Sequence, residues 1–293
     1  MIWPRDLNKK IKRHVKLSSL TTLRIGGEAE FFAEASGVEE LRTLLSCARR
    51  SGRKVFILGA GSNVLVSDSG LRGLVVRLCG KPFKSLKADG VFLEAGAGVG
   101  LNRLAGYAKE NGLSGLEFLA GIPGTLGGAL AGNAGAWGKS ICPLVHSVSV
   151  LDREGRHKTL SGGKIRFSYR RSSLGGYAIL SCRFRLRKGE GRGIDSRMRG
   201  YILRRRKTQK DTLPNAGCVF RNPGERSAGM LIDSCGLKGV SRGGAVISRC
   251  HANFILNRGG AASGDVLSLM RLMRRKVKDK FKIRMEPEIK IWK

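Results

Sequence analysis

Acidic residues are scarce in this chain of 293 residues, where 22 Asp and Glu stand against 55 Lys and Arg and give a formal net charge of +33. Such an excess creates a field that attracts polyanions. Aromatic residues make up only 6% of the chain, which argues against platforms for stacking nucleic-acid bases. The basic residues are also spread along the whole chain, without an aromatic-interleaved motif. We therefore expect no specific nucleic-acid partner, and interpret the charge as a steering field for an anionic substrate, compatible with loose attachment to an anionic membrane.

Long hydrophobic runs are missing as well. No stretch approaches the roughly 20 apolar residues that cross a bilayer, and the basic start of the chain lacks the apolar core of a secretory signal. The seven cysteines form no CxxC pair and the four histidines show no HxxxH or HExxH spacing. Neither a disulfide framework nor a metal site is predicted. We expect a cytoplasmic protein, with all cysteines except Cys218 serving as small core residues.

Glycine, by contrast, is concentrated in one place, since 14 of the 42 glycines lie between Gly90 and Gly138. The run 121–128 has the spacing GxxGxxGG, which is neither the dinucleotide fingerprint GxGxxG nor a P-loop. Glycine permits positive φ and a close approach to a ligand. We expect main-chain N–H groups here to surround an anionic group. The interleaved Ile122, Leu126 and Leu130 argue against a flexible linker.

Strand and helix signals alternate from Thr21 onward, which indicates an α+β fold. A buried strand over 54–58 ends in the turn GAGSN, which suits a backbone cradle for a pyrophosphate. A helix near 263–278 is expected to turn four apolar residues inward and four cations outward: Val266, Met270, Met273 and Val277, and Arg271, Arg274, Arg275 and Lys278. We predict a basic, poorly ordered lead-in over 1–16, a first domain over 17–187, a polar linker over 188–197 and a second domain over 198–293.

Seven segments, taken in order, resemble the UDP-N-acetylenolpyruvoylglucosamine reductase family, the flavin enzymes of peptidoglycan precursor synthesis. They are 21–27, 58–63, 121–138, 168–172, 215–223, 228–233 with 236–239, and 285–289. The resemblance covers nearly everything from about residue 17 to the end. It implies an FAD-binding module of the vanillyl-alcohol-oxidase (PCMH) type, built of two subdomains, followed by a C-terminal α+β substrate domain. The chain is similar to the shorter form of the family, which lacks the insertion folded over the substrate.

The resemblance also implies the chemistry. NADPH would reduce a non-covalently bound FAD, and flavin N5 would pass hydride to C3 of UDP-N-acetylglucosamine enolpyruvate while a proton reaches C2. Arg170 and Glu288 are implied as stabilisers on the carboxylate side. A guanidinium grips a carboxylate through two hydrogen bonds, whereas Glu288 helps only when protonated, so we expect surroundings that raise its pKa. The alternative for Arg170 is an ordinary surface arginine. The alternative for Glu288 is a strand carboxylate paired with Arg284 or Lys290.

Cys218 is a departure from the family pattern, because serine is expected there as the proton donor to C2. A thiol, with a reference pKa near ~8.5, is a far better acid than a hydroxyl. We therefore predict that Cys218 is a competent donor and is sensitive to alkylation. The alternative is a buried structural cysteine in an inactive relative.

The remaining implied site residues bind cofactor and substrate. The cofactor-binding residues are Gly59, Ala60, Gly61, Ser62, Asn63, Gly121, Ile122, Pro123, Gly124, Thr125, Gly127, Gly128, Asn133 and Gly135. The substrate-binding residues are Arg221, Asn222 and Lys238, for which a solvated basic face is the alternative. No histidine lies in the glycine-rich segment, which argues against a histidyl-linked flavin.

Two other functions stay open at this point. One is another PCMH-type flavin oxidoreductase. The other is a basic protein that binds anionic surfaces and keeps a vestigial flavin site. A monomer is expected in either case.

Overall fold

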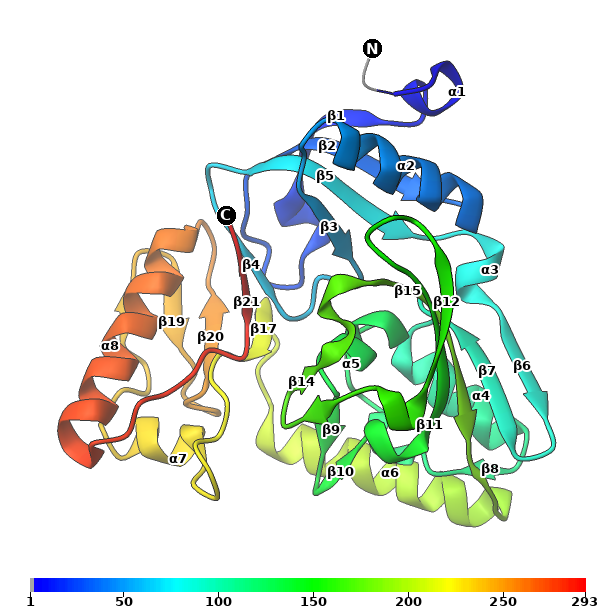
Figure 1. Cartoon of the computed structure of the whole chain (residues 1–293). Coiled ribbons are helices and arrows are strands. Elements are labelled where there is room, and N and C mark those ends of the chain that lie inside the picture. The colour runs from blue at the N-terminus through cyan, green and yellow to red at the C-terminus, as the bar shows by residue number, and fades with distance from the viewer. Residues whose placement is uncertain (1–2) are drawn as a thin grey trace. The chain divides into compact units, whose positions relative to one another are not determined.

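The chain falls into two compact units in the computed structural model, which describes residues 3–293. The first unit comprises residues 3–13, 31–60 and 73–205, and the second comprises 14–30, 61–72 and 206–293. Figure 1 traces the chain from blue to red. Because two N-terminal segments lie with the C-terminal part of the chain, the units do not follow a single cut in the sequence. The domain limits 17–187 and 198–293 stay a prediction.

The first unit is built on two sheets. The larger is antiparallel, in the order β12-β11-β15-β7-β6; its strands are His157–Ser161, Val145–Leu151, Ala178–Arg185, Phe92–Gly96 and Leu86–Asp89. The smaller has the order β1-β2-β5-β3, with strands Lys12–Lys16, Glu28–Ala35, Leu71–Leu78 and Val55–Leu58. The helices of this part of the chain are α1 (Arg5–Asn8), α2 (Val38–Arg50), α3 (Lys81–Lys84), α4 (Leu101–Glu110), α5 (Leu126–Ala131) and α6 (Gly191–Thr208).

The first unit also contains three short pairs of strands. They are β8 (Leu113–Ser114) with β16 (Arg187–Lys188), β9 (Gly135–Ala136) with β10 (Lys139–Ser140), and β13 (Phe167–Ser168) with β14 (Arg171–Ser172). The last two pairs are tight hairpins: the tip of β13–β14 carries Arg170, and β9 begins at Gly135, both of which the sequence assigns to the site.

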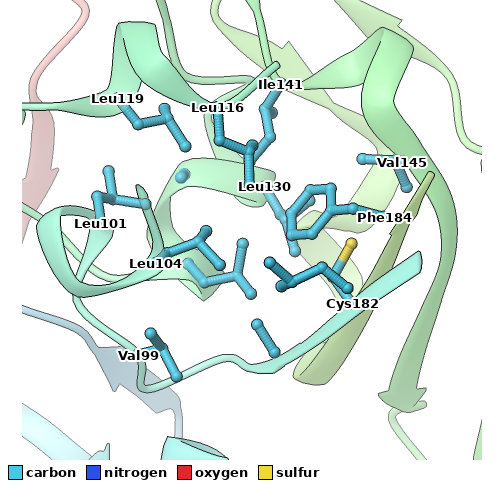
Figure 2. Packing of buried hydrophobic residues seen from close by; sticks show 14 of the residues in the cluster. Val99, Leu101, Leu104, Leu116, Leu119, Leu130, Ile141, Val145, Cys182 and Phe184 are labelled. Carbon is cyan, nitrogen blue, oxygen red and sulfur yellow. The ribbon is translucent and has the colours of Figure 1, made fainter. Parts of the chain in front are cut away.

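The core of the first unit lies between the larger sheet and the helices α4 and α5. Strand β11 reads VHSVSVL, and its buried Val145, Val148 and Val150 face this core. The side chains of Leu130, Cys182 and Phe184 belong to the same buried cluster (Figure 2). Burial raises the pKa of the Cys182 thiol well above its usual value. The prediction of core cysteines is confirmed for Cys47 and Cys182, which are buried, but wrong for Cys250, which is exposed.

Two segments differ from expectation because distant residues hold them. Residues 3–16 of the predicted lead-in include α1 and β1, and the buried ring of Trp3 meets Phe31 edge-on at 5.5 Å between centroids; residues 1 and 2 lie outside the described residues. Helix α6 begins at Gly191, inside the expected linker 188–197. Its glycines disfavour a helix, but Ile194 is buried and the guanidinium of Arg197 donates to the buried carboxylate of Glu117 at 2.9 Å. Tertiary contacts thus outweigh local propensity at both places.

The second unit is a small antiparallel sheet covered by helices. The sheet has the order β17-β20-β19-β18, with strands Asn215–Cys218, Phe254–Asn257, Ala245–Ile247 and Ser241–Arg242. Helices α7 (Ala228–Asp233) and α8 (Ser263–Phe281) contact each other, and α8 packs on β18 and β19 (Figure 1). Strand β21 (Lys290–Trp292) pairs in parallel with β4 (Val64–Val66).

Helix α8 confirms its predicted faces. The four predicted inward residues are buried in the core of the unit, and the four predicted outward cations are exposed. Among the described residues, no helix is long and apolar enough to cross a membrane.

A buried carboxylate organises the turn between β11 and β12. Asp152 accepts hydrogen bonds from Lys158 Nζ at 2.8 Å and from Arg156 Nε at 3.0 Å, besides the N–H groups of Glu154 and Arg156. The hydrogen bond from Lys158 is the largest cause that lowers the pKa of Asp152, and those from Arg156 and Glu154 add to it. Together they outweigh desolvation and hold this pKa well below its ordinary value. The folded state therefore binds this proton less tightly than the unfolded state.

We predict that D152N is less stable than the wild type at pH 7, and that the difference shrinks as the pH falls below about 4. The contribution of a carboxylate with a lowered pKa is present above its unfolded pKa and is lost on acidification. Urea unfolding at pH 7 and pH 3 measures the difference. D89N, at an exposed aspartate, is the control, and an equal loss of stability in D152N at both pH values would contradict the prediction.

Candidate functional site

The GAGSN turn follows β3 and is fixed by close main-chain packing. A Cβ atom on Gly59 would lie 2.4 Å from Thr125 Oγ1, within the first unit. Gly61 has φ of +65°, and a Cβ there would lie 2.3 Å from the carbonyl oxygen of Leu20, within the second unit. The Gly61 carbonyl also accepts the N–H of Thr22 at 3.1 Å. At Gly61 only glycine fits, because a side chain would meet backbone, and at Gly59 a side chain would displace the Thr125 hydroxyl; these contacts restrict the conformation of the turn.

The glycine-rich segment is equally fixed, which confirms that it is not a flexible linker. The N–H of Gly121 donates to Asn102 Oδ1 at 2.7 Å, and the carbonyl of Gly124 accepts the N–H of Leu101 at 3.0 Å. The N–H of Gly127 donates to the carbonyl of Ala97 at 2.8 Å. Helix α5 then begins at Leu126, whose side chain is buried in the core. The segment is thereby held against β7 and α4 and places its glycine backbone in a defined position.

Asn133 presents a buried acceptor without a protein partner. Its Nδ2 donates to the carbonyl of Ser168 at 2.9 Å, whereas Oδ1 is buried and receives no hydrogen bond from any residue within 3–293. A buried polar atom in this state is costly unless something satisfies it. A ring system with an N–H group, such as a flavin, supplies the missing donor. The residues present therefore fit a flavin cofactor in the first unit.

Arg170 lies at the tip of the β13–β14 hairpin and joins it to a second hairpin. Its Nη1 donates to the carbonyl of Gly135 in the β9–β10 hairpin at 2.7 Å, and its guanidinium lies 5.3 Å from the ring centroid of Tyr169. Arg170, Asn133 and Trp137 all have positive φ, at 57°, 44° and 57°. Such values are uncommon outside glycine and tend to gather at functional sites. The two hairpins thus form one hydrogen-bonded unit around the predicted cofactor residues.

Cys218 and the main chain of Glu288 come together in the second unit. Cys218 ends β17 opposite Phe254, after a bulge in which Gly217 has φ of +71° and donates its N–H to Asn215 Oδ1 at 3.0 Å. The half-buried thiol packs against the cluster that contains Phe254. The N–H of Glu288 donates to the carbonyl of Val219, the residue after Cys218, at 2.8 Å.

The predicted substrate residues follow directly along the chain. Arg221 is largely buried, and its Nη1 pairs with Glu286 Oε2 at 3.2 Å. Asn222 Oδ1 accepts the N–H of Ala228 at 3.0 Å and so fixes the loop that leads into α7. Lys238 Nζ lies 2.6 Å from Asp233 Oδ2.

Two residues near this group were missed by the sequence reasoning. Asn253 is buried and clamps Phe220, accepting its N–H at 3.0 Å and donating to its carbonyl at 2.8 Å. His251 stacks on Phe254 with 4.4 Å between centroids, and its Nδ1 is buried with no hydrogen bond from the described residues. Burial lowers the pKa of His251, which favours the neutral ring. Nothing in the sequence pattern marks either residue, because both roles depend on cross-strand neighbours.

Comparison with known proteins agrees with this geometry. Residues 29–161 match the family model described as an FAD binding domain, which places the chain among the flavoproteins. Residues 207–292 match the model of the UDP-N-acetylenolpyruvoylglucosamine reductase C-terminal domain. The chain belongs to the UDP-N-acetylenolpyruvoylglucosamine reductase family, and is an FAD-dependent oxidoreductase.

Individual relatives match over almost their whole length. UDP-N-acetylenolpyruvoylglucosamine reductase 2 of Symbiobacterium thermophilum is 42% identical over 285 residues, covering 97% of this chain and 92% of the relative. The reductase of Synechococcus elongatus is 42% identical over 292 residues, covering 98% and 96%. The crystal structure of UDP-N-acetylenolpyruvylglucosamine reductase (MurB) from Thermus caldophilus superposes with a TM-score of 0.84 at 36% identity, covering 97% and 99%.

We predict that G61A is clearly less stable than G52A and retains less FAD on purification. Both glycines have φ of +65°, but nothing lies within 4 Å of a Cβ on Gly52, whereas one on Gly61 meets the Leu20 carbonyl. Backbone strain alone costs about 1–2 kcal/mol, and the clash adds roughly 1–3 kcal/mol in G61A. Urea unfolding and the flavin-to-protein absorbance ratio are the measurements. Equal stability of the two variants would show that the close approach is not a constraint.

Proposed function

We propose that this chain catalyses the NADPH-dependent reduction of UDP-N-acetylglucosamine enolpyruvate to UDP-N-acetylmuramate. The observation that supports the proposal is sequence identity: the chain is 42% identical, over nearly its whole length, to reductases that are named for this substrate. FAD, when bound, supplies the hydride that it has accepted from NADPH. The protein's part is to place the substrate and to balance the charge and the proton that accompany hydride addition.

The first unit would hold the flavin. Asn133 Oδ1 is the acceptor that a ring N–H satisfies. Gly59 and the backbone from Gly121 onward would line the diphosphate, because their packing holds these segments of the first unit in one conformation. Gly61, which lies in the second unit, is proposed as a cofactor residue on the resemblance of the GAGSN turn. Ala60, Ser62 and Asn63 of the turn, and the other glycine-segment residues predicted above, complete the proposed cofactor site.

Arg170 would stabilise the negative charge that grows on the substrate carboxylate when hydride reaches C3. A guanidinium is permanently charged and its donors match a carboxylate in plane. Its hydrogen bond to the Gly135 carbonyl and its contact with Tyr169 fix it before substrate arrives. A charge fixed in advance needs no reorganisation as the reaction proceeds.

Cys218 would donate the proton to C2, and a protonated Glu288 would hydrogen-bond the carboxylate oxygens. The carbon–hydrogen bond at C2 forms as the S–H bond of Cys218 breaks, and the thiolate recovers its proton from solvent. The bulge at Gly217 and the apolar surface of Phe254 determine where the thiol points. The hydrogen bond between the Glu288 N–H and the Val219 carbonyl keeps the two groups on adjoining segments.

Arg221, Asn222, Lys238 and the neutral His251 would bind the UDP-sugar. Arg221 forms an ion pair with Glu286, and Lys238 forms one with Asp233. These ion pairs would hold the two cations in place for a diphosphate. His251 Nδ1 is buried and has no hydrogen bond from the described residues, and the bound substrate would supply its partner.

We also propose that the enzyme works in the cytoplasm as a monomer. All seven cysteines are free, as in a reducing compartment, and the proposed reductant NADPH is a cytoplasmic one. A net charge of +33 makes self-association unfavourable through repulsion between copies.

The first test is anaerobic. The purified protein is expected to carry flavin whose absorbance bleaches on addition of NADPH and returns on addition of UDP-N-acetylglucosamine enolpyruvate. The two colour changes report the two half-reactions separately. Bleaching without recovery would exclude this acceptor, and a colourless protein that takes up no added FAD would overturn the proposal.

For the proton donor, we expect C218S to turn over and C218A to bleach normally with NADPH but to recover colour about 10²–10⁴-fold more slowly. Only the second half-reaction needs the donor, so stopped-flow recording of both phases isolates its role. C79A, at another half-buried cysteine, serves as the control and should match the wild type. A C218A variant with normal recovery would remove Cys218 from the mechanism.

A further inference from the structure

Helix α8 carries a concentrated positive face that the proposed reaction does not use. We define the α8 basic face as Arg271, Arg274, Arg275 and Lys278, all four of them exposed. At 3.6 residues per turn, they lie within an arc of about 100° and span about 10 Å of helix. The core-facing residues of α8 lie on another side of the helix, so the four side chains are free to meet an external surface.

The arrangement is electrostatically unfavourable for the protein alone. Arg271 faces Arg274 and Arg275 at helical spacings of three and four residues, and Lys278 faces Arg274 and Arg275 in the same way. Like charges at these spacings destabilise a helix. None of the four forms an ion pair with any residue in 3–293. The C-terminal position favours Lys278, which lies in the last turn, but that effect fades beyond one turn and does not reach Arg271.

The proposed substrate site does not account for this face. The cations assigned to the diphosphate are Arg221 and Lys238, and each is paired with a carboxylate. The α8 basic face instead has four exposed cations that form no ion pair with the described residues, placed along one ridge of the helix. Such a ridge matches a broad anionic surface better than a small ligand enclosed by protein.

We propose that the α8 basic face docks the protein on an anionic phospholipid surface. The negative potential of such a surface attracts nearby cations, and this attraction needs no insertion of apolar groups. The apolar residues of α8 are buried in the core and are not available for insertion. A nucleic acid fits less well. None of the exposed large hydrophobic residues lies on α8, so the face offers no exposed aromatic ring on which bases could stack, and its arginines could contact a duplex only through phosphates and guanine edges.

The test compares two variants of equal charge. R271Q/R274Q/R275Q/K278Q neutralises the face, and K81Q/K84Q/K87Q/K164Q removes four exposed cations of the first unit; each lowers the net charge from +33 to +29, since 33 − 4 = 29. Holoprotein binding to vesicles of phosphatidylcholine with 30% phosphatidylglycerol is measured by co-sedimentation in 50 and 300 mM salt. Pure phosphatidylcholine vesicles and a duplex DNA are run in parallel.

We expect the wild type to bind the anionic vesicles in low salt and to dissociate in high salt, because screening shortens the reach of the charges. The face variant should bind at least about tenfold more weakly, while the control variant stays within about threefold of the wild type. Flavin content and turnover in the absence of vesicles should not change, and the unfolding midpoint of the face variant should not fall, since repulsion is relieved.

Three results would overturn the proposal. The first is a wild type that does not bind the anionic vesicles. The second is an equal weakening of both variants, which would mean that net charge alone is responsible. The third is a wild type that prefers duplex DNA over the vesicles at equal salt, with that preference lost in the face variant. None of them bears on the reductase activity, which the NADPH experiment tests separately.

Discussion

The close approach of main chain at Gly59 and Gly61 is the constraint on which the site depends. A Cβ at the first would lie 2.4 Å from Thr125 Oγ1, and one at the second 2.3 Å from the Leu20 carbonyl oxygen. Thr125 precedes α5, so the end of β3 is fixed against the start of that helix. Each contact is tight within its own unit, Gly59 against Thr125 in the first and Gly61 against Leu20 in the second. The backbone groups proposed to hold the cofactor are therefore positioned by packing rather than by hydrogen bonds alone.

Strain and hydrogen bonding then complement each other in the two hairpins. Asn133 and Arg170 accept positive φ, which costs of order 1–3 kcal/mol each. Their side chains cross in opposite directions, Asn133 to the Ser168 carbonyl and Arg170 to the Gly135 carbonyl. Each bond thus links one hairpin to the other. The guanidinium of Arg170 is thereby held in one orientation, which suits the role proposed for it beside the substrate carboxylate.

The sequence was most informative where local pattern decides structure. The faces of α8 follow from its periodicity, and the glycine spacing correctly indicates an ordered segment. Asn253, Trp3 and the start of α6 could not be predicted, because each depends on one distant partner, namely Phe220, Phe31 or Glu117. The orphaned atoms of Asn133 and His251 were likewise invisible, since burial of a single side-chain atom is a property of the packed fold. The motifs identified the family and the enzyme class, whereas the contacts that support the predicted site residues could not be read from the sequence.

The cysteine at position 218 is consistent with its surroundings as well as with the proposed chemistry. Its cross-strand neighbour Phe254 is buried, and the thiol packs against that apolar cluster. A thiol is both a small hydrophobe and a better acid than a hydroxyl, so it suits a position beside the Phe254 ring and the proton-donor role proposed for it. The cost of the thiol is its susceptibility to oxidation and alkylation, which a reducing compartment keeps small.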